Sequence, residues 1–86
     1  MISKKTRAIC IPNLIGNIPN WIAIKRIAKK YNLIIEDSAN ALGSKINNKS
    51  SGFYSNISIT SFYGSHIINC ARNGGMVCFN NKKYFD

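Results

Sequence analysis

The chain has 86 residues, of which 45% are hydrophobic, and a formal net charge of +9 at pH 7. This length allows one small domain at most, the apolar content excludes a wholly disordered chain, and no apolar run approaches the roughly 18 to 20 residues that cross a bilayer. The charge would suit nucleic acid, but four of the cations lie on the outer face of one predicted helix, where solvated charge is ordinary: Lys25, Arg26, Lys29 and Lys30.

The first half of the chain predicts a strand, a helix and a second strand. Residues 8–11 form a short apolar run ended by Pro12, as expected of a buried strand. After turn residues, apolar side chains recur at helical spacing: Trp21, Ile24, Ile27, Ala28 and Tyr31. Asn20 or Asn17 is placed to cap this helix, which should end at Asn32. Residues 33–36 are the second predicted strand.

The second half predicts two further strands. Residues 38–44 should form a loop or a short helical turn, and the polar residues 45–56 an exposed excursion. Residues 57–62 alternate as a third strand, and residues 75–79 form a fourth, apolar strand. Residues 80–86 look like a turn and the first residues of a helix.

A strand, a helix and a strand within about thirty residues make a βαβ unit, which implies parallel pairing with a right-handed crossover. The expected fold class is therefore α/β with a mostly parallel sheet. Because such a sheet needs helices on both faces and the sequence offers one full helix, residues 1–86 should be a single partial domain cut from a larger one.

Polar side chains gather where the predicted strands end. Asp37 follows the second strand, and the run from Ser61 to His66 closes the third. Open α/β sheets bind ligands at the carboxyl ends of their strands, so these residues are candidates for a site. Each also has an ordinary interpretation: Asp37 as a helix cap or surface carboxylate, Ser61 as strand-end polarity, and His66 as a packed or surface side chain.

The cysteines give no sign of a metal site. Cys10, Cys70 and Cys78 are widely spaced and form no Cys-x-x-Cys pair, and His66 is the only histidine. A four-ligand zinc site of the usual spacing cannot be completed from them. Each cysteine lies in an apolar stretch, so we expect reduced thiols in the core. With an N-terminus that makes a poor secretion signal, this indicates a cytoplasmic protein.

Four motifs occur in an order and at a spacing that resemble one family. They are Thr6-Arg7-Ala8-Ile9 with Gly16-Asn17, the run from Tyr31 to Gly43 that contains Glu36-Asp37-Ser38-Ala39-Asn40, the run from Ser61 to His66, and Gly74-Gly75. Together they resemble the DegT/DnrJ/EryC1/StrS family of nucleotide-sugar aminotransferases, which carry pyridoxal 5'-phosphate (PLP) on the aspartate-aminotransferase-like fold, fold type I. The resemblance implies an internal slice of the PLP-binding large domain, without its flanks or the small C-terminal domain, from a full-length homodimer.

The resemblance also implies roles for individual residues. Asp37 matches the aspartate that bonds the pyridinium nitrogen of the cofactor, and Asn40 takes the place of a side chain that reaches the phenolic oxygen of the ring. Ser61 matches the serine that bonds the phosphate. His66 stands where the aminotransferases have the lysine that binds the cofactor covalently, and no lysine lies between Lys49 and Lys82 to replace it.

A histidine at this position resembles one branch of the family, the 3-dehydrases of 4-keto-6-deoxy nucleotide sugars. In that branch pyridoxamine 5'-phosphate (PMP) is held without a covalent link, and the histidine is the base that removes a proton. The resemblance therefore implies a fragment of a PLP- or PMP-dependent enzyme acting on a nucleotide-linked keto-sugar in lipopolysaccharide, surface polysaccharide or deoxysugar biosynthesis, with amination and deoxygenation both open. We expect the 86 residues alone to be inactive.

Two alternatives come from other classes. One is a small, basic, non-catalytic protein that binds nucleic acid or another polyanion, although the abundance of Lys, Asn and Ile indicates a compositional bias rather than a designed patch. The other is an inactive gene remnant. The leading interpretation expects neither nucleic acid nor a membrane as a partner.

Overall fold

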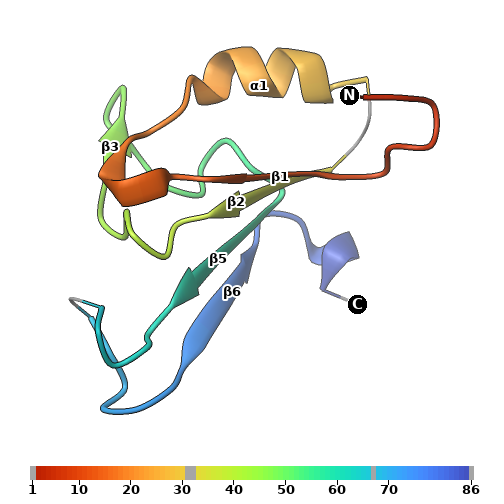
Figure 1. The fold of residues 1–86 in the computed structure, drawn as a ribbon. Helices are drawn as coiled ribbons and strands as arrows, with labels where there is room; N and C mark the ends of the chain where they lie inside the picture. The colour runs from red at the N-terminus through yellow and green to blue at the C-terminus, as the bar shows by residue number, and fades with distance from the viewer. Residues whose placement is uncertain (1, 31–32, 67, 86) are drawn as a thin grey trace.

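The computed structural model describes residues 2–30, 33–66 and 68–85. Four strands form one sheet in the order β1-β2-β5-β6, with bounds β1 Ile9–Pro12, β2 Ile34–Asp37, β5 Ile57–Ser61 and β6 Gly75–Phe79 (Figure 1). The first three strands are parallel, whereas β6 pairs antiparallel with β5. The expected α/β class with a mostly parallel sheet is therefore confirmed.

The strand bounds differ from the predicted ones by at most one residue. β1 and β2 pair in register from Ile9 with Ile34 to Pro12 with Asp37, so the ladder extends one residue further than the apolar runs. The link after β5 folds back on itself as a protruding arm, described at residues 62–66 and 68–74 (Figure 1), in which the Phe62 N–H donates to the Gly74 carbonyl at 2.7 Å. This return makes β6 antiparallel, a direction that the apolar pattern does not encode.

Helix α1 spans Trp21–Ala28 and begins at the predicted cap. The side chain of Asn20 accepts a hydrogen bond from the Ala23 N–H at 3.0 Å, which decides between the two candidate caps. The predicted end at Asn32 was too late, because α1 ends at Ala28 and residues 29–30 form a turn; residues 31–32 themselves lie outside the described residues. Ile27 was expected to face inward but is 55% exposed. The expectation was wrong because Ile27 is turned by about 100° around the helix from the buried Ala28.

The segment from residue 45 to 56 is more than an exposed excursion. It begins with a small antiparallel hairpin of β3 (Lys45–Ile46) and β4 (Lys49–Ser50). Its second part then turns inward, with Gly52 and Ser55 buried, so that part of the prediction was wrong. The reason is a tertiary anchor: the side-chain amide of Asn80 donates to the carbonyl oxygens of Gly52 at 2.6 Å and Ser55 at 2.7 Å.

Two short 3₁₀ turns complete the described elements. η1 spans Leu14–Gly16, between β1 and α1. η2 spans Lys82–Tyr84, where the sequence predicted the first residues of a helix, and the side chain of Asn81 accepts from the Lys83 N–H. Within the described parts of the chain, every helix is too short or too polar to cross a lipid bilayer.

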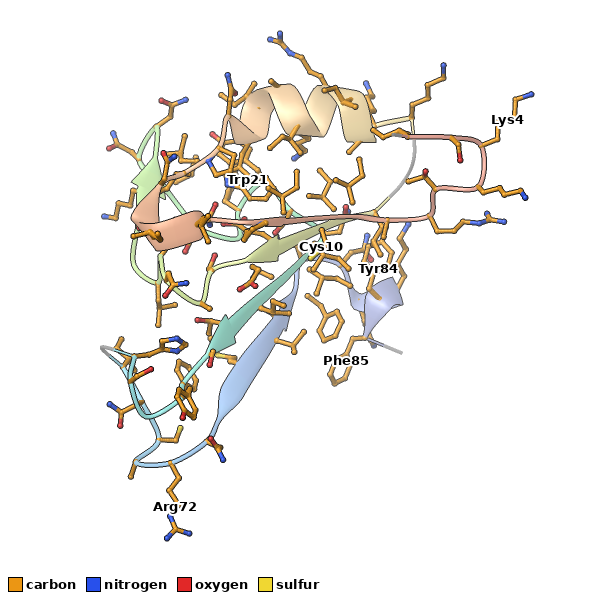
Figure 2. All side chains as sticks on the ribbon, viewed as in Figure 1. Lys4, Cys10, Trp21, Arg72, Tyr84 and Phe85 are labelled. Atoms are coloured by element: carbon orange, nitrogen blue, oxygen red, sulfur yellow. The ribbon has the colours of Figure 1, made fainter. Side chains whose placement is uncertain are left out.

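The two faces of the sheet differ in cover. α1 lies over one face, and the core there consists of Trp21, Ala28 and Ile34 with half-buried neighbours (Figure 1). The other face carries Cys10, together with apolar side chains of which Val77 is 51% exposed. Figure 2 shows Trp21 between α1 and the sheet and Cys10 on the opposite side of β1.

The three cysteines are free, as expected, but they are not in the core. Cys10, Cys70 and Cys78 are all exposed. Cys10 alternates with the half-buried Ile9 and Ile11 and so takes the uncovered face, while Cys70 lies on the arm and Cys78 on the edge strand. The prediction that apolar sequence neighbours would place these thiols in the core was therefore wrong.

A buried polar network joins the carboxyl ends of β1 and β2 to the segment before β5. Asn13, Trp21 and Glu36 are each 1% exposed. The Asn13 amide donates to Glu36 Oε1 at 2.7 Å and accepts from the Trp21 indole N–H at 2.9 Å. Ser38 Oγ donates to the same Glu36 oxygen at 3.2 Å, and the Gly52 N–H donates to Glu36 Oε2 at 2.8 Å. The network thus fixes three strand ends against one carboxylate.

Replacing Asn13→Ala should lower the free energy of unfolding by about 3 kcal/mol, because it leaves a buried carboxylate and a buried indole N–H short of partners. The matched control is Asn17→Ala, at an exposed residue, which should change the free energy of unfolding by less than about 0.5 kcal/mol. Urea unfolding followed by far-ultraviolet circular dichroism measures both. Equal unfolding midpoints for the two variants would contradict the role given to Asn13.

Candidate functional site

A pocket of about 190 Å³ lies where β5 passes into the arm, beside the loop that follows β2. Both segments contribute polar and apolar residues to its lining. The lining residues are Ala39, Asn40, Leu42, Ser61, Ser65, His66 and Ile68. Three of the four residues singled out in the sequence, Asn40, Ser61 and His66, therefore meet in one pocket, although they are spread over 27 positions of the chain.

His66 is half-buried and held from several sides. Its Nδ1 lies 3.0 Å from the carbonyl oxygen of Ser61. Its backbone N–H donates to the Tyr63 carbonyl at 2.9 Å, and its own carbonyl accepts from the Asn69 side-chain amide at 3.1 Å. The ring of Tyr63 stands edge-on to the imidazole, with 6.3 Å between ring centroids. The turn therefore presents the imidazole to the pocket in a defined orientation.

Ser61 ends β5, and its hydroxyl oxygen accepts a hydrogen bond from the Tyr63 N–H at 3.2 Å. The hydroxyl hydrogen is left for another acceptor, since a serine hydroxyl both donates and accepts. Across the ladder, Ser61 pairs with Gly75, where an added Cβ would lie 3.0 Å from the Thr60 carbonyl oxygen. At Gly74 a Cβ would lie 2.7 Å from Cys70 Sγ, so the predicted glycine pair permits the close return of the arm.

Asp37 lies outside the pocket lining, but it emerges on the same face of the sheet as Ser61. Its Cα pairs with that of Ile59, two residues before Ser61, and side chains two apart on a strand share a face. Asp37 is half-buried, and its Oδ1 accepts from the Ala39 N–H at 3.0 Å. This bond shapes the turn that carries Ala39 and Asn40 into the pocket.

The sequence interpretation missed the different tasks of two adjacent carboxylates. Glu36 and Asp37 are neighbours in one sequence motif, yet strand alternation sends Glu36 into the buried network and Asp37 to the opposite face. Asn13 falls among the residues expected to form the turn before the helix, whereas its side chain bonds both Glu36 and Ser38. The alternation of β2 was the signal that could have separated them. The burial of Asn13 depends on contacts 23 residues away.

The residues present suit an anionic ring cofactor such as PLP. Ser61 offers a hydroxyl donor for a phosphate, Asn40 an amide donor for a ring oxygen, and Asp37 a carboxylate for a protonated ring nitrogen. No lysine lines this pocket within the described residues, so no primary amine is at hand for a covalent link. The same described residues contain no cluster of three or more histidines, cysteines or carboxylates of the kind that holds a metal ion.

Comparison with known proteins gives results that agree with the resemblance found in the sequence. The model of the DegT/DnrJ/EryC1/StrS aminotransferase family matches residues 1–86. The GDP-perosamine synthase of Escherichia coli O157:H7 is 41% identical over 86 residues, which are 99% of this chain and 23% of that protein. The chain spans only 17% to 23% of the length of the first curated relatives it matches.

Solved structures share the fold. The aminotransferase from Psychrobacter cryohalolentis superposes with a TM-score of 0.89 at 31% identity, over 95% of this chain and 21% of that one. The E. coli GDP-4-keto-6-deoxy-D-mannose-3-dehydratase with bound hydrated PLP superposes with a TM-score of 0.82 at 26% identity, over 98% of this chain and 22% of that one. The predicted resemblance and the fold type I architecture are thereby confirmed.

The two adjacent carboxylates allow a matched test of their different tasks. Glu36→Gln should lower the free energy of unfolding by about 2 kcal/mol, because an amide NH₂ then faces one of the buried donors that the carboxylate accepts. Asp37→Asn keeps an acceptor for the Ala39 N–H and should cost less than about 0.5 kcal/mol. Both variants remove one negative charge, so urea unfolding compares them directly. A larger loss from Asp37→Asn would refute the assignment.

Proposed function

The chain belongs to the DegT/DnrJ/EryC1/StrS aminotransferase family, and we propose that it is part of the PLP-binding large domain of a nucleotide-sugar enzyme of the 3-dehydrase type. The family and the solved relatives are PLP-dependent enzymes. The finer proposal is that this enzyme holds PLP or PMP without a covalent link and removes oxygen from a 4-keto-6-deoxy sugar, in lipopolysaccharide or other surface polysaccharide synthesis.

One observation carries this proposal: the pocket contains His66 and no lysine among its described lining residues. An imidazole has no primary amine and cannot bind the cofactor as a lysine does. It can exchange a proton near neutral pH, which is the property of a general base. The position therefore favours proton abstraction over covalent amino transfer.

The other site residues have roles that match their placement. The Ser61 hydroxyl, whose oxygen already accepts from the Tyr63 N–H, would donate its hydrogen to the cofactor phosphate. The Asn40 side chain would donate to the phenolic oxygen. The carboxylate of Asp37 would accept a hydrogen bond from the ring nitrogen and keep that nitrogen protonated. When bound, the cofactor supplies a ring that draws electrons from the carbon that loses its proton.

The substrate in this proposal is a nucleotide-linked keto-sugar, and the full-length enzyme is a homodimer. Support comes from relatives whose names refer to GDP-linked sugars. The polyanion-binding alternative has little support. Three of the lysines each lie over an aromatic ring, and these pairs are on separate parts of the chain. These pairs are Lys25 with Tyr54, Lys49 with Phe53, and Lys83 with Tyr84.

A gain of covalent binding tests the site. The variant His66→Lys places a primary amine at this position. After incubation with PLP and reduction with borohydride, position 66 should be modified to a greater extent than the exposed lysines at 82 and 83. In the unaltered chain, the peptide containing His66 should stay unmodified. Mass spectrometry of proteolytic peptides measures both.

A second substitution controls for non-specific labelling. Adding Ser61→Ala to His66→Lys should reduce labelling at position 66 by about tenfold, because a hydrogen bond to a charged group contributes roughly 1.5–3 kcal/mol. Labelling at the exposed lysines should not change. If position 66 is modified no more than Lys82 in either variant, this pocket does not hold the cofactor.

A further inference from the structure

We propose that the backbone carbonyl of Ser61 holds His66 in the tautomer with hydrogen on Nδ1, so that Nε2 is the basic atom. This inference rests on the proposed function, which needs a base at position 66 but does not say which nitrogen acts. The carbonyl acts through the imidazole and is a positioning group. It is distinct from the Ser61 hydroxyl, to which the proposed function gives the phosphate.

The assignment follows from what each atom can do. A carbonyl oxygen only accepts hydrogen bonds, so the 3.0 Å contact between His66 Nδ1 and the Ser61 oxygen requires the hydrogen on Nδ1. A neutral imidazole carries one such hydrogen, and Nε2 is then left with its lone pair. In the other tautomer two lone pairs would face each other at this distance. The ring would have to turn away from Ser61.

The acceptor and the ring are both anchored, so the contact does not depend on a loose loop. Ser61 is the last residue of β5 and pairs with Gly75. The next residue is tied across the arm by the bond from the Phe62 N–H to the Gly74 carbonyl, and Tyr63 bonds back to the Ser61 hydroxyl oxygen. Only five positions separate donor and acceptor, and the turn between them is closed by the His66 N–H.

With the hydrogen fixed on Nδ1, the imidazole of His66 need not reorient before it accepts a proton. Nε2 takes the proton of a C–H group in the pocket, and the electron pair of the broken bond stays on that carbon. The imidazole becomes an imidazolium with hydrogen on both nitrogens. The bond from Nδ1 to the Ser61 carbonyl persists throughout and is strengthened by the positive charge, as charge-assisted hydrogen bonds are.

Nuclear magnetic resonance of the imidazole nitrogens tests this directly, because His66 is the only histidine in the chain. The chain is labelled with ¹⁵N-histidine, and long-range ¹H–¹⁵N spectra are recorded at alkaline pH, where an ordinary imidazole is neutral. The folded chain should show a protonated Nδ1 and an unprotonated Nε2. Its ratio of Nδ1–H to Nε2–H should exceed that of the urea-unfolded chain by about tenfold.

The variant Ser61→Ala separates this inference from the proposed function. It removes the hydroxyl but keeps the carbonyl, so the tautomer should be unchanged while cofactor trapping in the His66→Lys background falls. A dominant Nε2–H form in the folded chain, or a ratio that unfolding leaves unchanged, would overturn the tautomer assignment. Either result leaves the trapping experiment at position 66 free to support the proposed function independently.

Discussion

The architecture depends on one buried carboxylate. Glu36 accepts hydrogen bonds from Asn13, Ser38 and the Gly52 backbone, which belong to the segments after β1, after β2 and before β5. Burying a charge is costly unless it is fully hydrogen-bonded, and three neutral donors meet that need here. Because these bonds are directional, they fix the strand ends relative to one another, which apolar packing alone does less strictly.

The same constraint decides where the site residues point. On a strand, neighbouring side chains take opposite faces, so anchoring Glu36 inside sends Asp37 to the other face. A slip of one residue would exchange the two carboxylates and remove Asp37 from the face it shares with Ser61. Ser38 extends the constraint to β5, because its N–H donates to the Ile59 carbonyl at 2.8 Å and its carbonyl accepts from Thr60 Oγ1.

Local patterns predicted the elements better than their tertiary contacts. Apolar runs gave all four main strands within one residue at either end, and Asn20 marked the start of α1. The family motifs predicted Asn40, Ser61 and His66 as site residues, and all three line one pocket. The network around Asn13 could not be predicted because its partners lie far along the chain. The direction of β6 depends on backbone bonds of the arm, and the glycine pair permits this return without predicting it.

The two sides of the sheet show why a small part of a family fold can hold the geometry of its site. The open face presents apolar side chains of β6, including Val77, and such a face gains stability when other elements cover it. The carboxyl ends of the strands are different, because their polar groups bond to one another within the described residues. The exposure of this apolar face therefore lowers the stability of the fold. The relative placement of Asp37, Ser61 and His66 depends instead on the pairing of β2 with β5, on the Glu36 network and on the contact between His66 Nδ1 and the Ser61 carbonyl, all of which this chain contains.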